Sequence, residues 1–196
     1  MEVNAVKGAV VASLREGAEL RLRLIESAVD VIVEAAQAIN VCIRSGGKIL
    51  LFGNGGSAAD AQHIAAEFVC RFSRDRDPLP AIALTTDTSA LTAIANDYGF
   101  ERVFARQVDA LCQSSDVVIA ISTSGRSPNV IAGIEAARAR GARTIGLTGG
   151  EGGQMSEAVD IPIVIPTNRT ARIQECHITV GHLICEVVES LLPSSE

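Results

Sequence analysis

Hydrophobic positions along this chain follow two different spacings. In residues 3–44 the apolar side chains recur at helical spacing without a proline, which predicts two long helices with a break around Ser27–Asp30. Further helical patterns cover residues 57–73, 88–111, 128–140 and 169–192. Between these patterns lie short runs that are apolar throughout, as expected of strands buried on both faces of a sheet. The runs are Lys48–Phe52, Ala81–Leu84, Val117–Ile121, Thr144–Leu147 and Ile161–Ile165.

The alternation of strands and helices predicts an α/β fold, a three-layer αβα sandwich around a five-stranded parallel sheet. We expect one domain over residues 1–196, with helices in 1–45 and the αβα core in 46–192. The N-terminal helices have an apolar face that the sheet core does not need. That face is predicted to pack against another subunit.

Composition excludes several classes of function. The net charge is 17 − 23 = −6 and the chain has one Tyr and no Trp, so it lacks the basic and aromatic surface that nucleic-acid binding uses. No apolar stretch is long enough to span a membrane, and the charged first twenty residues do not read as a signal peptide. Five scattered cysteines predict buried free thiols and therefore the cytoplasm.

Two turns share one design, in which an apolar strand runs into a Gly/Ser-rich turn that opens a helix. The first is Asn54-Gly55-Gly56-Ser57, where Gly55 or Gly56 needs a positive φ and Ser57 is a candidate helix cap. The second is Ser122-Thr123-Ser124-Gly125-Arg126-Ser127, with Ser127 as N-cap before Pro128. Either turn could simply be a well-capped connection, but four hydroxyls in six residues favour a phosphate or other anion site.

Two helices carry side chains for chemistry. His63 and Glu67 lie four residues apart on one helix face and could ligate a metal, act as an acid/base pair, or form an ordinary ion pair, with Asp60 nearby. On the last helix Gln174 and His182 can face one cleft, and His177 competes with His182 for that role. Spacing alone does not choose between the two histidines.

Two further segments are weaker candidates. Asn96-Asp97-Tyr98-Gly99 interrupts a helical pattern and reads first as a turn, although its polar groups could meet sugar hydroxyls. Thr85-Thr86-Asp87 follows a predicted strand, so it is expected at the same edge of the sheet as the two Gly/Ser turns.

Taken together, the motifs resemble those of the phosphoheptose isomerases within the sugar isomerase (SIS) domain family, and the resemblance covers nearly the whole chain. The segments that carry it are Phe52–His63, Leu84–Asp87, Ala95–Tyr98, Ala120–Gly125 and Ala171–His177. The resemblance implies interconversion of sedoheptulose 7-phosphate and D-glycero-D-manno-heptose 7-phosphate, the first step of heptose synthesis for lipopolysaccharide or surface glycans. It also implies a homotetramer with active sites at subunit interfaces.

Carried over position by position, the resemblance assigns the base to Glu67 and the acid to His182. It places zinc on His63, Glu67, Gln174 and His182. Some members of the family have Asp where this chain has Ala171. The substrate contacts it implies are Asn54, Gly55, Gly56, Ser57, Glu67, Asn96, Asp97, Ser122, Thr123, Ser124, Ser127 and Gln174.

The implied chemistry agrees with these residue types. Aldose–ketose isomerisation moves a proton between C1 and C2 through an enediol(ate), which requires a carboxylate base and an acid near the oxygens. Zinc can stabilise the developing oxyanion, although a carboxylate that ligates zinc throughout is a poor base. The alternatives are a non-catalytic SIS protein that binds a replication initiator, and an isomerase of another sugar phosphate. The presence of both Glu67 and His182 disfavours the non-catalytic reading.

Overall fold

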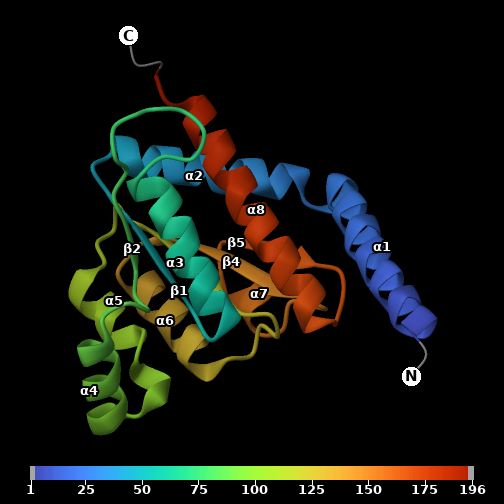
Figure 1. Ribbon diagram of the computed structural model, residues 1–196. Helices are drawn as coiled ribbons and strands as arrows, with labels where there is room; N and C mark the ends of the chain where they lie inside the picture. Colours follow the sequence, from blue (N-terminus) through green and yellow to red (C-terminus); the bar gives the residue numbers. More distant parts are fainter. Residues whose placement is uncertain (1–2, 194–196) are drawn as a thin grey trace.

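The computed structural model describes residues 3–193 as an open sheet with helices on both faces (Figure 1). The elements are α1 (Val3–Ser27), α2 (Val29–Arg44), β1 (Ile49–Gly53), α3 (Gly56–Val69), β2 (Ala81–Ala83), α4 (Thr88–Tyr98), the 3-10 helix η1 (Phe100–Arg102), α5 (Ala105–Leu111), β3 (Val117–Ile121), α6 (Pro128–Ala139), β4 (Arg143–Gly149), α7 (Met155–Ala158), β5 (Ile161–Ile165) and α8 (Thr170–Leu191).

All five strands are parallel, in the order β2-β1-β3-β4-β5. The predicted three-layer α/β architecture is therefore confirmed. Strand order reverses at β1, which has β2 on one side and β3 on the other. In sheets of this kind ligands bind outside the carboxyl ends of the strands, at the point of reversal. The two Gly/Ser turns follow β1 and β3, so topology places both at that point.

Strand burial explains why the runs are apolar throughout. Along β1, successive side chains point to opposite faces: Ile49 and Leu51 pack with α2, α3 and α8, while Leu50 and Phe52 pack with the helices of the other face. Phe52 stacks on Phe104 with ring centroids 4.9 Å apart. The side of the sheet that carries α3 and α8 is the side on which the candidate chemistry lies.

Several boundaries differ from the sequence prediction. The helical pattern over 88–111 is interrupted as predicted, since Gly99 takes a φ of 86° and ends α4, but residues 96–98 belong to α4 and the remainder forms η1 and α5. Strand β4 extends beyond the predicted run Thr144–Leu147 at both ends, to Arg143 and Gly149. The short helix α7 was not predicted, since four residues show no periodicity. The break between α1 and α2 lies at Ala28, inside the predicted segment.

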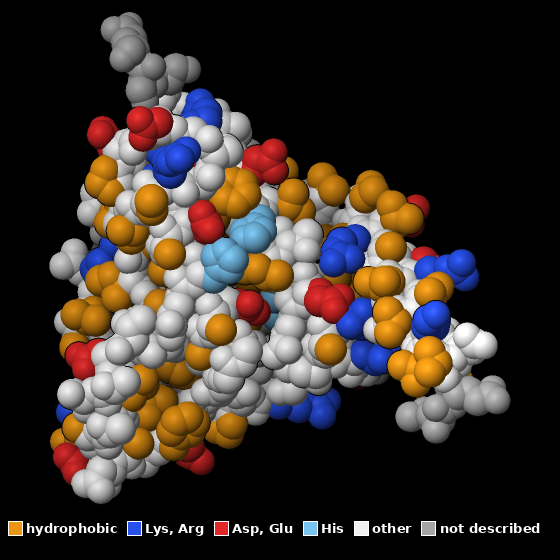
Figure 2. Space-filling view, viewed as in Figure 1, with side chains coloured by type: hydrophobic (Ala, Val, Ile, Leu, Met, Phe, Trp, Pro, Cys, Tyr) orange, Lys and Arg blue, Asp and Glu red, His pale blue; other side chains and the backbone are white. Residues whose placement is uncertain are grey.

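Helix α1 projects from the sheet beside the amino end of α8 (Figure 1). Polar contacts hold it there: the Arg172 guanidinium donates to Ser13 O over 2.7 Å, Arg23 donates to Pro166 O over 2.9 Å, and Arg169 pairs with Glu16. Much of the rest of its surface is apolar and exposed (Figure 2). These exposed side chains are Val3, Val6, Val10, Val11, Leu14, Leu22 and Ile25.

Candidate functional site

The first Gly/Ser turn is built around Gly55, which has a φ of 56° and stands at the N-cap position of α3. The expected positive φ is confirmed, but the expected cap is wrong. Because Gly55 makes the turn, α3 already begins at Gly56, and Ser57 lies inside its first turn, only 3% exposed. A Cβ on Gly53 would lie 2.8 Å from Ser57 Cβ, so close packing at the end of β1 accounts for that burial.

The two turns are joined by a pair of amides that the sequence did not suggest. Asn54 donates to Asn129 Oδ1 over 2.9 Å, and Asn129 donates back to Asn54 Oδ1 over 2.8 Å. Asn129 is buried in the first turn of α6, where a hydrophobic side chain would be usual. In the sequence, only its position directly after Ser127 and Pro128 indicates that Asn129 lies near the second turn. The pair fixes the β1–α3 turn relative to the start of α6.

The second turn follows β3 and leads into α6, with Ser127 at the N-cap and Pro128 at the first helical position, as predicted. The Ser122 and Ser127 hydroxyls lie 3.0 Å apart, and Ser124 Oγ accepts a hydrogen bond from Arg126 N over 3.2 Å. Beside this turn is a cavity of about 370 Å³. It is lined by Thr123, Ser124, Arg126, Gly149, Glu151, Gly153, Asn168, Thr170 and Ile173.

Gly125 gives the second turn its shape. Its φ is 62°, and a Cβ there would overlap Gly152 O, so the Gly-rich β4–α7 loop packs directly against the turn. Met155 N donates to Gly125 O over 3.0 Å and reinforces that contact. The hydroxyls of Thr123 and Ser124 are thereby presented from a fixed backbone.

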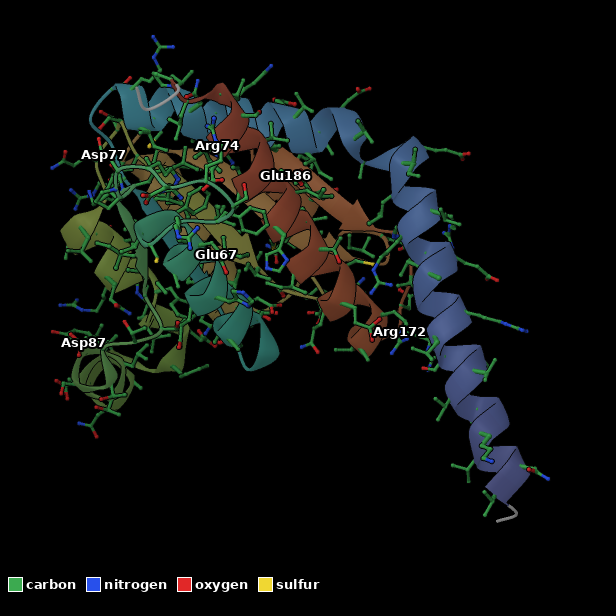
Figure 3. All side chains as sticks on the ribbon, turned by 45° about the horizontal axis from the view of Figure 1, so that its top comes forward. Glu67, Arg74, Asp77, Asp87, Arg172 and Glu186 are labelled. Atoms are coloured by element: carbon green, nitrogen blue, oxygen red, sulfur yellow. The ribbon has the colours of Figure 1, made fainter. Side chains whose placement is uncertain are left out.

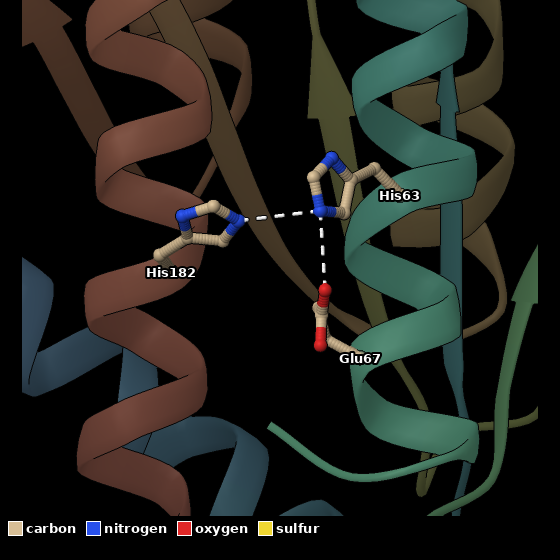
Figure 4. A group of neighbouring side chains, drawn as sticks. All are labelled: His63, Glu67 and His182. Carbon is tan, nitrogen blue, oxygen red and sulfur yellow. Dashed lines mark hydrogen bonds and ion pairs between the residues drawn. The ribbon is translucent and has the colours of Figure 1, made fainter. Parts of the chain in front are cut away.

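Helices α3 and α8 bring together three side chains from distant parts of the chain (Figure 4). His63 Nε2 lies 3.1 Å from Glu67 Oε1 and 3.4 Å from His182 Nε2. The possible ligand atoms of the three residues all lie within 4.8 Å of one another. On the surface, histidines lie at a hollow in the middle of this face, with acidic side chains beside them (Figure 2).

Close helix packing creates this cluster. Gly181 precedes His182 on α8, and Ile64 follows His63 on α3. A Cβ on Gly181 would lie only 2.5 Å from Ile64 Cδ1, so no larger residue fits at this helix spacing. The glycine thus sets how near the two imidazoles come.

The structure chooses between the two histidines of α8. His177 is fully buried, and its Nε2 lies 3.1 Å from Thr148 O, which can only accept a hydrogen bond. Burial lowers the pKa of His177 to about 4, against a smaller opposing effect of that hydrogen bond, so the ring is neutral. His177 is a core residue that supports β4, and His182 is the histidine of the cluster.

Other predicted residues lie at varying distances from the cluster. Gln174 packs its amide onto Gly56, where a Cβ would overlap it, and so joins α8 to the first turn. Burial raises the pKa of Asp60, and the charge of His63 partly offsets this effect.

Asn96 and Asp97 are exposed on the last turn of α4, where Asn96 Nδ2 donates to Asp97 Oδ1 over 2.8 Å. Asp87 caps α4 by accepting from Ala90 N.

A second hollow, of about 580 Å³, lies at the opposite edge of the sheet beside Asp116. The Asp116 carboxylate is already bonded to Lys48 Nζ, Lys48 N and Gln113 N, at 2.7 to 2.9 Å. Nothing in the described part of this hollow resembles the histidine cluster, so the chemistry is assigned to the carboxyl edge.

Comparison with known proteins identifies the family of the chain. Residues 14–149 match the model of the SIS domain family. The chain belongs to the SIS domain family. It is 56% identical over 178 residues to the phosphoheptose isomerase of Aquifex aeolicus, covering 91% of this chain and 93% of that protein. It is 57% identical over 183 residues to the phosphoheptose isomerase of Roseiflexus sp., covering 93% of each chain.

Solved structures show the same likeness. The phosphoheptose isomerase of Neisseria gonorrhoeae superposes with a TM-score of 0.90 at 45% identity, covering 94% of this chain and 99% of that one. The corresponding enzyme of Francisella tularensis gives a TM-score of 0.91 at 34% identity, covering 94% and 98%. Within residues 3–193, none of the helices combines the length and apolar character that a membrane crossing would require.

Proposed function

We propose that this chain is a sugar-phosphate isomerase that converts D-sedoheptulose 7-phosphate to D-glycero-D-manno-heptose 7-phosphate. The observation that carries the proposal is the meeting of His63, Glu67 and His182 across α3 and α8, beside two Gly/Ser turns. More than half of the aligned residues are identical to those of proteins named phosphoheptose isomerase. The product is a heptose phosphate of the kind used for lipopolysaccharide precursors.

In the proposed mechanism the Ser122–Ser127 turn and the start of α6 hold the phosphate through hydroxyls and free backbone N–H groups. The Asn54–Ser57 turn lies along the sugar. Glu67 takes the proton from the carbon next to the carbonyl, and His182 supplies a proton to the oxygen as the enediol(ate) forms. Glu67 then returns the proton to C2, the former carbonyl carbon, while His182 takes the proton of the C1 hydroxyl, so that the new carbonyl forms at C1 and both residues are restored.

Zinc is a cofactor that these residues fit. Two imidazoles and one carboxylate, whose ligand atoms all lie within 4.8 Å of one another, form a donor set typical of catalytic zinc. His63, Glu67 and His182 would hold the ion. Gln174, the fourth ligand that the family resemblance implies, has its amide against Gly56; with four protein ligands, a substrate oxygen would replace one of them or become a fifth. When bound, zinc polarises a carbonyl and stabilises developing negative charge on oxygen. Glu67 can act as base only through a carboxylate oxygen that is free of the metal.

The exposed apolar side chains of α1 support assembly into a homotetramer. Asn96 and Asp97 lie on α4, apart from the α3–α8 pair in Figure 1. They would complete the substrate site if it formed between subunits.

Four of the five cysteines are buried free thiols, which supports a cytoplasmic location, while Cys70 is exposed. The complete histidine–glutamate cluster counts against a purely non-catalytic role.

The proposal is tested with sedoheptulose 7-phosphate and Glu67→Gln. We expect kcat to fall by about 10²- to 10⁴-fold, because the variant lacks the base but keeps the shape of the site. Product is followed by NMR, together with deuterium uptake at C2 in D₂O. Glu34→Gln, an exposed carboxylate on α2, serves as the matched control and should retain wild-type turnover. Wild-type turnover in Glu67→Gln would refute the mechanism.

A further inference from the structure

A buried ion pair lies directly behind the histidine–glutamate cluster. Arg76 Nε donates to Glu189 Oε1 over 3.0 Å, and the two side chains are 6% and 2% exposed. Glu189 lies on α8 seven residues after His182, which is two turns along nearly the same face. Arg76 lies in the segment that leaves α3 after Glu67 and crosses α8 (Figure 1).

Arg76 also binds the helix that carries Glu67. Its guanidinium donates to the backbone oxygen of Glu67 over 2.9 Å and to that of Phe68 over 2.9 Å. Carbonyls in the last turn of a helix have no partner within the helix, so Arg76 supplies a donor to Glu67 O and shares Phe68 O with Leu79 N, which donates to it over 3.0 Å. One rigid, forked cation therefore joins the backbone of Glu67 to the carboxylate of Glu189.

Glu189 organises the segment that contains Arg76. Its carboxylate accepts hydrogen bonds from Phe72 N, Ser73 N, Ser73 Oγ and Arg74 N, at 2.8 to 3.1 Å, in addition to Arg76. Burial acts to raise the pKa of Glu189, but these hydrogen bonds outweigh it and lower the pKa to about 2, so the group is charged at neutral pH.

The same segment reaches the cluster. The ring of Phe72 lies 5.4 Å from the ring of His182, centroid to centroid. Figure 3 shows Arg74 and Asp77 on this segment, with Glu67 on α3 and Glu186 on α8. The loop thus contacts α8 at two places, through Phe72 at His182 and through its backbone at Glu189.

We propose that Arg76 and Glu189 are positioning residues for the isomerase, which fix the separation of Glu67 on α3 and His182 on α8. Neither group touches the reacting atoms. They act by joining the end of α3, the Phe72 loop and α8 into one unit behind the cluster. This inference rests on the proposed roles of Glu67 and His182.

The test uses Arg76→Lys, which keeps the charge but loses the planar guanidinium that binds Glu189 and the backbone oxygens of Glu67, Phe68 and Asp77 at once. We expect kcat for sedoheptulose 7-phosphate to fall about tenfold or more while KM changes less than about twofold, because only the geometry of the catalytic pair is disturbed. The pH profile of kcat should shift as well. Arg76→Met should be more severe than Arg76→Lys, so the conservative change gives partial rescue.

Lys48→Met is the matched control. Lys48 forms another largely buried ion pair, with Asp116, at the opposite edge of the sheet. Its loss should lower the unfolding midpoint without changing kcat. If Arg76→Met does not fold, Ser73→Ala removes one 2.8 Å hydrogen bond from Glu189 and should still lower kcat about twofold or more.

The outcomes separate the two proposals. Wild-type kcat and pH profile in folded Arg76→Lys and Ser73→Ala, with only a lower unfolding midpoint, would overturn the positioning role. That result alongside an inactive Glu67→Gln would leave the isomerase mechanism intact. Full turnover in Glu67→Gln would remove both proposals.

Discussion

The contact between Gly181 and Ile64 gives a prediction whose size follows from the structure. A Cβ at position 181 would lie 2.5 Å from Ile64 Cδ1, whereas ordinary contacts begin at 3.4 Å. Gly181→Ala therefore requires α3 and α8 to separate by 3.4 − 2.5 = 0.9 Å unless Ile64 moves. The neighbouring residues, His63 and His182, would separate with them.

We expect this change to affect rate more than stability. Overpacking costs about 1–3 kcal/mol, and the better helix propensity of Ala returns up to about 1 kcal/mol, so the net loss of unfolding free energy should be about 0–2 kcal/mol. Misplacing catalytic groups by about 1 Å can cost on the order of 100-fold in rate. Turnover should thus fall by about 100-fold in a protein that remains folded.

The assay is steady-state isomerisation of sedoheptulose 7-phosphate, paired with denaturant unfolding. Gly8→Ala is the control, because Gly8 lies in α1 with no atom within 4 Å of an added Cβ. An added Cβ would also lie 2.7 Å from Ile64 Cγ1, so Ile64→Ala, which removes both Cγ1 and Cδ1, should recover much of the lost rate in Gly181→Ala, as a double-mutant cycle would reveal. Wild-type turnover in Gly181→Ala, or a loss that Ile64→Ala leaves unchanged, would refute the reasoning.

Three further predictions concern other parts of the site. Burial lowers the pKa of His177 in the folded protein to about 4, below its unfolded value of about 6.5, so the unfolded state takes up a proton first as the pH falls. The free energy of unfolding should therefore decrease between pH of about 6.5 and about 4. Relative to His177→Gln, the wild type should lose up to about 3 kcal/mol over that range. Gly125→Ala should raise KM for the sugar phosphate and lower stability by about 1–3 kcal/mol, since the residue has a positive φ and no room for a Cβ. Purified protein should contain zinc that chelation removes, and His63→Gln should contain less, as measured by elemental analysis.

Each of these has an outcome that contradicts it. A pH dependence of stability equal in wild type and His177→Gln would show that the buried ring does not titrate as inferred. An unchanged KM in Gly125→Ala would separate the second turn from phosphate binding. Equal zinc content in wild type and His63→Gln would contradict the proposed metal site. Full turnover in protein from which a chelator has removed all metal would contradict the proposed metal role.

The sequence predicted the three layers and the five parallel strands, because strands buried on both faces, such as Val117–Ile121, are apolar throughout. The strand order was not predicted. It also predicted the pairing of His63 with Glu67, since spacing of four on a helix fixes a common face. Boundaries were weaker where one glycine decided the geometry: Gly55 started α3 early and buried Ser57. The interruption at Asn96–Gly99 was predicted, although the structure places its first three residues in α4.

Long-range relations were beyond local pattern. Nothing in the residues alone distinguished His182 from His177, because the choice depends on which face of α8 meets α3. The Asn54–Asn129 amide pair and the Arg76–Glu189 ion pair join segments more than seventy residues apart, and each becomes visible only when the helices are packed. These contacts join the two Gly/Ser turns to each other and the end of α3 to α8.

The docking of α1 has a consequence for how solution conditions act on the protein. One side of this helix is held by Arg172, Arg23 and Arg169, and the opposite side presents exposed valines and leucines. Chloride and sulfate salts screen the polar contacts equally at equal ionic strength, while Leu20 and Leu24 keep this helix packed into the core. Sulfate also strengthens the burial of apolar surface, so at equal ionic strength it should favour self-association through the exposed side of α1 more than chloride does.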